Sequence, residues 1–335
     1  MPSVRLMEVC GTHTMSIARN GIKATLPEGV ELISGPGCPV CVTPAGVIDG
    51  ILDLAMREDV IIATYGDMVR VPGSEPGDNL ARRRALGAKV SVVYSPVDAI
   101  DLAEQNPDRQ VVFLGVGFET TAPGTAASVL IARDRKIRNY SVYSLLKTCE
   151  PAIRALEQTE GFRIDGFLLP GHVATIIGVK GFDFLDLPGV VAGFEADDIR
   201  RAIRLLLTQI ENGEHRVENA YTRAVSWEGN RKAQQMMEKC LVKREDLWRG
   251  LGSIPESGLA LREEYADFDA EKKFVIPRNP EKKTACRCGD VITGKISPDT
   301  CPLFGKRCVP EDPVGPCMVS SEGACAATYK YQWTK

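Results

Sequence analysis

The stretch VVFLGVGFETT, residues 111–121, combines a strand pattern with the start of a helix. It opens with large apolar residues and no polar alternation, which is typical of a parallel strand buried on both faces. Gly117 lets the backbone turn, Glu119 projects from the strand end, and Thr120 or Thr121 can cap the next helix. The third glycine of a dinucleotide-binding fingerprint is absent, so a nucleotide site is disfavoured. The stretch therefore predicts a strand–turn–helix unit.

Seven more apolar runs of this kind occur in the first 220 residues, separated by segments with helical spacing such as Val47–Arg57 and Thr125–Arg133. Alternating strands and helices predict βαβ units and doubly wound sheets. The seven predicted strands are Leu6–Cys10, Val30–Ile33, Val60–Thr64, Val90–Tyr94, Tyr140–Leu145, Gly166–Leu169 and Val190–Ala192.

A weak internal repeat indicates two related lobes. LMEVCGTHT (6–14) resembles LGVGFETT (114–121), and VVYSPVDAIDLA (92–103) resembles VVAGFEADDIRRA (190–202). We therefore predict two similar doubly wound parallel-sheet lobes, residues 1–105 and 106–222. The pattern then changes to polar and helical over 218–275 and to cysteine-rich after 276. Residues 223–335 are thus predicted to form a helical linker and a third, Cys-rich domain.

Composition excludes several classes of function. The net charge of −3 and the lack of a basic stripe argue against nucleic-acid binding. No run of about 18 apolar residues predicts a membrane span. The N-terminus lacks the apolar region of a secretory signal, so we expect a cytoplasmic protein. Eleven cysteines in that setting indicate metal ligands or working thiols, and with only three histidines a metal must be held mainly by sulfur.

Six of the cysteines fall within 40 residues of the C-terminal segment. This segment has too little apolar surface to order itself, and a metal centre can supply the missing free energy. Wide, irregular spacing without paired C-x₂₋₄-C knuckles favours an iron–sulfur cluster over zinc, with free or disulfide-bonded thiols as a third possibility. Spacing does not select four ligands among Cys286, Cys288, Cys301, Cys308, Cys317 and Cys325.

The turn GPGCPVC (35–41) carries a C-x-x-C pair. Thr43 is a plausible helix N-cap and Pro44 a plausible first helical residue, which would place the pair just before a helix N-terminus. That position favours a thiolate, so Cys38 and Cys41 are predicted to form a redox pair. Half of a zinc knuckle and a purely structural turn remain alternatives.

Cys10 is predicted to end the first strand, where open α/β sheets bind ligands. His13 could lower the pKa of this thiol or hold a hydrogen bond to a ligand. His172, in PGHV, is placed at another strand end. A buried thiol beside a helix-capping threonine is the alternative. Together these positions predict a cleft between the lobes that carries Cys10, Cys38 and Cys41.

Several longer motifs resemble one known family: MEVCGTHT, GPGCPVC, YGDMVRVPGS, GFETT, PGHV, WRGLG and CPLFG…MVSSEGACAA. They are similar to those of the HypD family, the D-type maturation (formation) factors of nickel–iron hydrogenases, from residue 5 to about residue 331. The resemblance implies two α/β lobes and a third domain with a 4Fe–4S cluster. It also implies a scaffold and redox protein that assembles the Fe(CN)₂(CO) unit of the hydrogenase active site. The implied partners are a small C-type chaperone, whose N-terminal cysteine co-ligates the iron, and a cyanide-donating E-type protein. The hydrogenase large subunit would be served indirectly.

The resemblance also implies roles for single residues. Cys10 would ligate the iron, and Cys38 and Cys41 would be the redox-active pair near the cluster. The implied cluster ligands are Cys288, Cys301, Cys308 and Cys325, with Cys286 and Cys317 as additional cysteines. The residues implied to line the cleft are His13, Glu119, Thr120, Thr121 and His172. The alternatives are a general thiol–disulfide oxidoreductase acting through Cys38 and Cys41, a cysteine hydrolase using Cys10 and His13, and a zinc-stapled interaction module.

Overall fold

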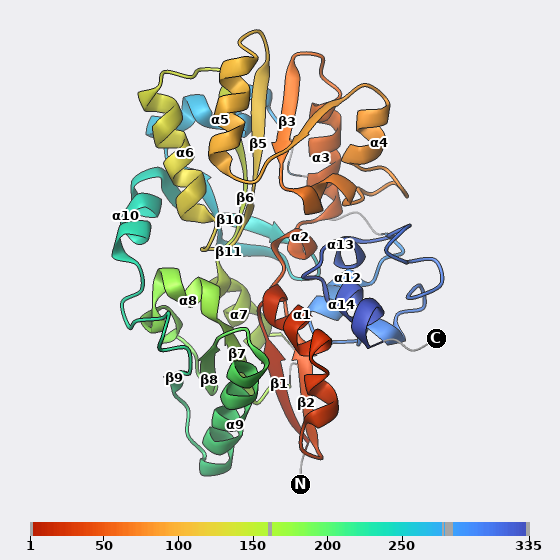
Figure 1. Ribbon diagram of the computed structural model, residues 1–335, viewed down its shortest axis with the longest axis vertical. Helices are drawn as coiled ribbons and strands as arrows, with labels where there is room; N and C mark the ends of the chain where they lie inside the picture. Colours follow the sequence, from red (N-terminus) through yellow and green to blue (C-terminus); the bar gives the residue numbers. More distant parts are fainter. Residues whose placement is uncertain (1–2, 160–162, 277, 279–283, 333–335) are drawn as a thin grey trace.

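The computed structural model describes residues 3–159, 163–276, 278 and 284–332. Two parallel sheets form two lobes, one above the other, with the C-terminal segment beside their junction (Figure 1). The lower sheet contains β1 (Val4–Glu8), β2 (Val30–Ser34), β7 (Gly166–Pro170), β8 (Gly189–Ala192) and β9 (Val217–Asn219). The upper sheet contains β3 (Val60–Thr64), β4 (Lys89–Val92), β5 (Gln110–Gly117) and β6 (Tyr140–Leu146).

The two sheets share one strand order. It is β2-β1-β7-β8-β9 in the lower sheet and β4-β3-β5-β6 in the upper one, with every pair parallel. In each sheet the order reverses beside its first strand, between β1 and β7 and between β3 and β5. Such reversals are where open α/β sheets bind ligands beyond the strand ends. All eight predicted strands are present, and the α/β class with two parallel-sheet lobes is confirmed.

The predicted division at residue 105 does not follow the sheets. β1 and β2 belong with β7–β9, whereas β5 and β6 belong with β3 and β4. The chain therefore leaves the lower lobe after β2 and returns to it before β7. Which buried parallel strands pair with one another cannot be read locally from the sequence, because all of these strands are similarly apolar. The prediction therefore placed strands that are neighbours along the chain in the same lobe.

Helices cover both faces of each sheet. In the lower lobe, α1 (Gly11–Arg19) and α9 (Ala196–Asn212) share one buried cluster with the sheet. In the upper lobe, α5 (Pro96–Gln105) and α6 (Ala122–Asp134) pack on one face and α3 (Ala45–Ala55) and α4 (Leu80–Ala85) on the other. The short helices near the junction of the lobes are α2 (Pro39–Val42), α7 (Cys149–Glu157) and α8 (Gly171–Ile177).

The segment 218–275 was predicted to be helical, and this is only partly right. Between α10 (Arg231–Cys240) and α11 (Ala270–Phe274), β10 (Leu241–Trp248) and β11 (Gly252–Leu261) form an antiparallel hairpin. Its register shifts between Arg244 and Asp246, so no regular alternation marks it in the sequence. The hairpin is held by the upper lobe, where Ser144 Oγ donates to the Leu259 carbonyl at 2.5 Å.

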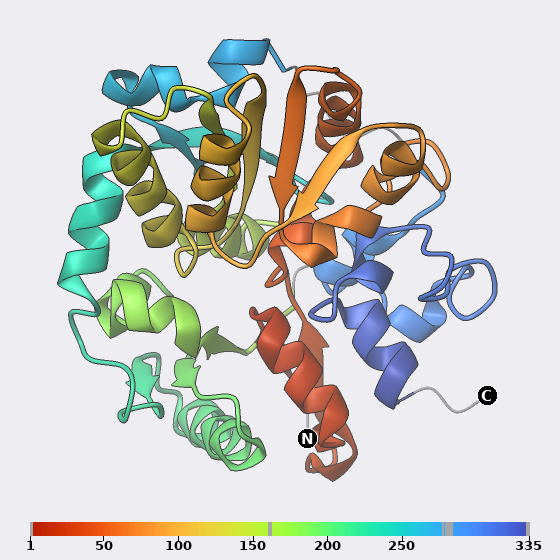
Figure 2. The same ribbon diagram turned by 45° about the horizontal axis from the view of Figure 1, so that its top comes forward.

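The C-terminal segment, residues 284–332, is called the cysteine-rich tail below. It contains α12 (Cys288–Ile292), α13 (Pro316–Val319) and α14 (Ala324–Tyr331). α14 lies along α1, as Figures 1 and 2 both show. Ser320 Oγ donates to Asp67 at 2.9 Å and Thr12 Oγ1 donates to Glu322 at 2.6 Å, so the tail is bonded to both lobes. Within the described residues, no helix is both long and apolar enough to cross a membrane.

Candidate functional site

The C-x-x-C pair lies where the chain first crosses between the lobes. Cys38 is the N-cap of α2, Pro39 is its first residue, and the Cys41 amide donates to Cys38 Sγ at 3.1 Å. Cys38 and Cys41 form a disulfide. Thr43 ends α2 instead of capping the next helix, and Pro44 is the N-cap of α3. The pair thus lies at the start and within a short helix of its own, α2, whereas the sequence predicted that it would lie just before the next helix.

Cys10 lies two residues after the end of β1 and is the N-cap of α1, beside the reversal of strand order. Its amide donates to the buried Glu8 carboxylate at 3.1 Å. Burial raises the pKa of the Cys10 thiol to about 12, and the charges of Glu322 and Glu8 act in the same direction. Burial likewise raises the pKa of Glu8 to about 7. Cys10 is therefore a neutral thiol at neutral pH, and a metal would have to displace its proton.

The GPGCPVC turn lies directly on Cys10. The Gly11 amide donates to the Gly37 carbonyl at 3.0 Å. A Cβ atom at Gly37 would lie 2.2 Å from the Cys10 nitrogen, so only glycine allows this approach. The structure thus brings the backbone of Cys10 against the turn that carries the Cys38–Cys41 disulfide.

The two histidines stack on one aromatic ring of the lower lobe. Phe194 lies 4.8 Å from the His13 ring and 3.8 Å from the His172 ring, measured between centroids. His13 Nε2 is 2.9 Å from the Gly193 carbonyl, and burial lowers the pKa of this ring to about 4. The ring is therefore neutral and lends no positive charge to Cys10, whereas a backbone hydrogen bond from His13 lowers the pKa of the Cys10 thiol.

The upper lobe contributes Glu119 and a thiol that the sequence reasoning left unassigned. Glu119 is buried after β5, and its Oε1 accepts the Cys149 amide at 2.8 Å. Burial raises the pKa of both side chains, and a negative charge on Cys10 would raise that of Cys149 further. Thr121 is the N-cap residue of α6 but makes no side-chain capping bond, and Thr120 is exposed. A cysteine opening a helix was the only available signal for Cys149.

All six cysteines of the tail line one narrow, partly open cavity. Apolar side chains such as Val291, Leu303 and Phe304 complete its wall. Several sulfurs accept backbone amides: Cys286 from Cys288 at 3.3 Å, Cys317 from Cys325 at 3.3 Å and Cys308 from Val314 at 3.4 Å. Cys286 and Cys317, implied to be additional, line the cavity like the other four. The geometry does not separate the two groups.

The donor set of this cavity suits an iron–sulfur cluster. Cysteine sulfurs are soft donors, and amide bonds to sulfur in an apolar shell are typical of such centres. Among the residues that the structure describes, no group of three or more His, Cys, Asp or Glu is arranged to hold a metal ion. The cavity also reaches the disulfide turn, because Cys288 Sγ lies 3.9 Å from the Cys41 carbonyl oxygen.

Comparison with known proteins identifies the family. The HypD model, described as "Hydrogenase formation hypA family", matches residues 1–332. The chain belongs to the HypD family. Its HypD relatives include hydrogenase maturation factor HypD1 of Bradyrhizobium diazoefficiens, 46% identical over 98% of this chain and 89% of the relative. The hydrogenase maturation factors HypD of Azotobacter vinelandii and Escherichia coli are 46% and 45% identical over the same shares. The family predicted from the sequence motifs is therefore confirmed.

Proposed function

We propose that this protein is a hydrogenase maturation factor on which the Fe(CN)₂(CO) unit of a nickel–iron hydrogenase is assembled. One observation carries the proposal: the GPGCPVC turn touches Cys10 on one side and the cysteine cavity on the other. A metal-binding thiol, a two-electron sulfur pair and a candidate cluster site thus adjoin within one junction. The partners are a small C-type chaperone and a cyanide-donating E-type protein.

In this proposal Cys10 holds the iron that is being built up. Iron with cyanide and carbonyl ligands prefers a soft thiolate, and the chaperone's N-terminal cysteine supplies a second one. Cys10 lies at the reversal between β1 and β7, the position at which open α/β sheets bind ligands. Because the thiol is buried, it exchanges its proton for iron only when the iron is delivered to it, which suits a controlled assembly site.

The tail cavity would hold a 4Fe–4S cluster through Cys288, Cys301, Cys308 and Cys325, the set implied by the family motifs. Such a cluster supplies electrons one at a time. The Cys38–Cys41 disulfide takes up two electrons and two protons, its S–S bond breaks, and two thiols result. Cys41 is the residue of the pair that contacts the cavity. The pair can therefore convert single electrons into the two-electron steps of ligand attachment.

Burial argues against the rival of a general thiol–disulfide oxidoreductase. Such enzymes need a disulfide that substrate thiolates can reach. Here Cys38 is 4% exposed and Cys41 is fully buried. An internal electron source fits this pair better than an external thiol.

Infrared spectroscopy of the protein purified anaerobically with its chaperone tests the iron role. We expect metal-bound cyanide and carbonyl bands, which Cys10→Ala removes while the tail cluster remains. Cys240→Ala is the matched control, because Cys240 is also buried but lies in α10 beside the Ala126 carbonyl. Bands that persist in Cys10→Ala would show that Cys10 is not the iron ligand.

Iron, sulfide and zinc analysis tests the cluster. We expect four iron and four sulfide per chain and broad thiolate-to-iron absorption near about 400 nm. A colourless protein with one zinc would refute the cluster. Alanine variants of each of the six tail cysteines then show which four are ligands, since only those lose the iron.

A further inference from the structure

Arg249 joins the hairpin to the disulfide helix. It directly follows β10, is 3% exposed and binds three successive carbonyls at the end of α2. Its amide donates to Val42 at 2.7 Å, its Nε to Cys41 at 3.1 Å and its Nη2 to Thr43 at 2.8 Å. The planar guanidinium can bind two carbonyls at once, which a lysine ammonium at the same place matches poorly. One residue thus fixes the backbone that carries Cys41.

The same junction reaches the cysteine cavity. The Cys41 carbonyl that accepts from Arg249 also lies 3.9 Å from Cys288 Sγ. Next to Arg249, Gly250 packs on Gly289 of α12 so closely that a Cβ at Gly250 would lie 2.6 Å from the Gly289 Cα atom. The hairpin turn is therefore wedged between the disulfide helix and the first helix of the tail.

Arg249 also brings a positive charge close to the cavity wall, because its guanidinium binds the Cys41 carbonyl that Cys288 Sγ approaches. A cation at this place would stabilise the extra negative charge of a reduced centre.

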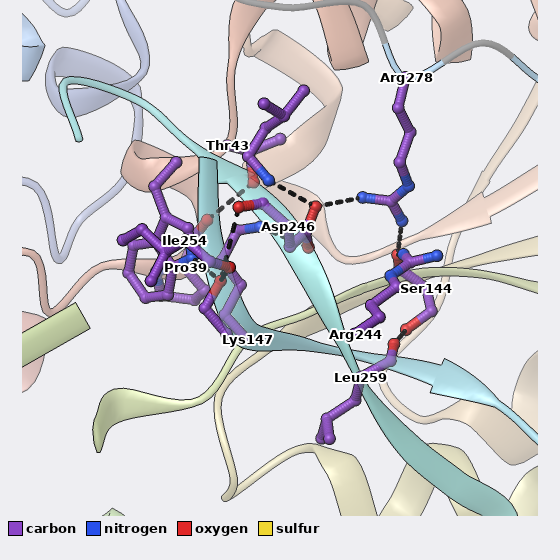
Figure 3. A network of polar contacts seen from close by, with 12 residues as sticks. Pro39, Thr43, Ser144, Lys147, Arg244, Asp246, Ile254, Leu259 and Arg278 are labelled. Carbon is purple, nitrogen blue, oxygen red and sulfur yellow. Dashed lines mark hydrogen bonds and ion pairs between the residues drawn. The ribbon is translucent and has the colours of Figure 1, made fainter. Parts of the chain in front are cut away.

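The hairpin that carries Arg249 is anchored in the upper lobe. Three residues earlier, Asp246 accepts from Lys147 and from Arg278, both at 2.7 Å, in the buried network of Figure 3. Trp248 donates through Nε1 to Ser257 Oγ at 2.8 Å. The end of β10 is thus held on both sides, so Arg249 is a fixed support for α2.

We infer that Arg249 is a positioning residue that holds the Cys38–Cys41 helix against the cysteine cavity and so governs electron delivery to the disulfide. The inference rests on the proposed function. In the step concerned, two electrons supplied singly through the cavity's cluster and two protons break the S–S bond and give two thiols. The electrons come from an external one-electron donor, and Arg249 itself is neither oxidised nor reduced.

The test compares wild type with Arg249→Gln, Arg249→Lys and the control Arg70→Gln. Arg70 also links a lobe to the tail through two carbonyl bonds, to Pro310 and Glu311, and neither carbonyl belongs to α2. Cluster-loaded and cluster-free samples are reduced anaerobically with dithionite, and the freed thiols are trapped and counted by mass spectrometry. In the wild type we expect faster disulfide loss in the loaded protein. Arg249→Gln should cut that rate about tenfold or more, as expected when charge-assisted hydrogen bonds are lost, Arg249→Lys should lie between, and Arg70→Gln should match wild type.

Hydrogen exchange of the cluster-free proteins gives a second readout. Loss of the Arg249 contacts should raise exchange in the peptide that covers residues 38–44, whereas Arg70→Gln should leave it unchanged. The inference is overturned if both Arg249 variants keep the wild-type rate of disulfide reduction and the wild-type hydrogen exchange. It is also overturned if Arg70→Gln slows disulfide reduction as much as the Arg249 variants do. If the wild type itself shows no cluster-dependent reduction, the proposed relay fails, whatever the variants do.

Discussion

The buried pair of Lys147 and Asp246 should be one of the most sensitive points of the molecule. The two side chains are 2% and 0% exposed, and their charged atoms are 2.7 Å apart. Asp246 accepts two further hydrogen bonds, from Arg278 and from the Leu247 amide. Lys147 also lies 5.4 Å from the centre of the Trp248 ring. Changing either charge leaves the other in a place that water does not reach.

The two single changes should differ in cost. Asp246→Asn removes the negative charge to which both Lys147 and Arg278 are bonded in Figure 3. We therefore expect a loss of about 3–5 kcal/mol in the free energy of unfolding. Lys147→Met keeps the shape and leaves Asp246 bonded to Arg278, so its cost should be about 1.5–3 kcal/mol. Lys147→Met combined with Asp246→Leu removes both charges and should cost clearly less than the sum of the single changes.

Urea unfolding followed by tryptophan fluorescence measures these differences, because Trp248 is fully buried beside the pair. Asp59→Asn is the control, since it breaks an ion pair with Arg57 that is about half exposed on each side, and it should cost about 0–1 kcal/mol. Equal costs for Asp246→Asn and Lys147→Met, or additive costs in the double variant, would refute this reading of the network.

Three further outcomes follow from the site. Gly37→Ala places a Cβ 2.2 Å from the Cys10 nitrogen and should cost about 3 kcal/mol in urea unfolding, whereas Gly124→Ala, which meets only Pro96 at 3.9 Å, should cost nothing. Burial raises the pKa of Glu8 from 4.5 to about 7, so the folded state binds this proton more tightly than the unfolded state does. As the pH rises from 4.5 to 7, the wild type should therefore lose about 3 kcal/mol of its free energy of unfolding. Glu8→Gln should lack that loss, and the contribution of His13 cancels in the comparison. One thiol contact lowers the pKa of Cys288 and of Cys317, but a second thiol contact and burial together raise both pKa values. Cluster reconstitution should therefore release protons and run faster at about pH 8.5 than at about pH 7, as absorbance and pH-stat measurements would show.

The strands could be predicted because a strand buried on both faces must be apolar throughout. Val60–Thr64 is buried at every position, and its predicted bounds match the structure. The sheet to which each strand belongs could not be predicted, since β1 pairs with β7 over more than a hundred residues that carry no local sign of it. The hairpin was missed for a related reason. Its strands are held by Ser144 and Thr148 of the upper lobe, so tertiary contacts and not local preference decide their conformation.

In the candidate site, too, some features could be predicted from the sequence and others could not. Cysteine is a residue type that often binds metals or takes part in redox reactions, so Cys10, Cys38 and Cys41 could be chosen from the sequence as candidate site residues. The orientation of His13 could not, because its ring follows the carbonyl of Gly193, which lies 180 residues away. Arg249 belongs to the motif WRGLG, but its role could not be predicted, since the carbonyls that it binds are known only from the fold.

The topology explains why the disulfide turn can serve two sites at once. Residues 35–44 form the crossing from the lower to the upper lobe, so this short segment must touch both (Figure 1). The tail is bonded to each lobe as well, through Thr12–Glu322 below and Asp67–Ser320 above. The cysteine cavity is therefore held at the crossing by both lobes together. A movement of one lobe against the other would alter the contacts of Cys41 with Arg249 and Cys288 before it disturbed either sheet. Electron delivery to Cys38 and Cys41 should for that reason depend on how the lobes are held, and a partner that binds across them could control it.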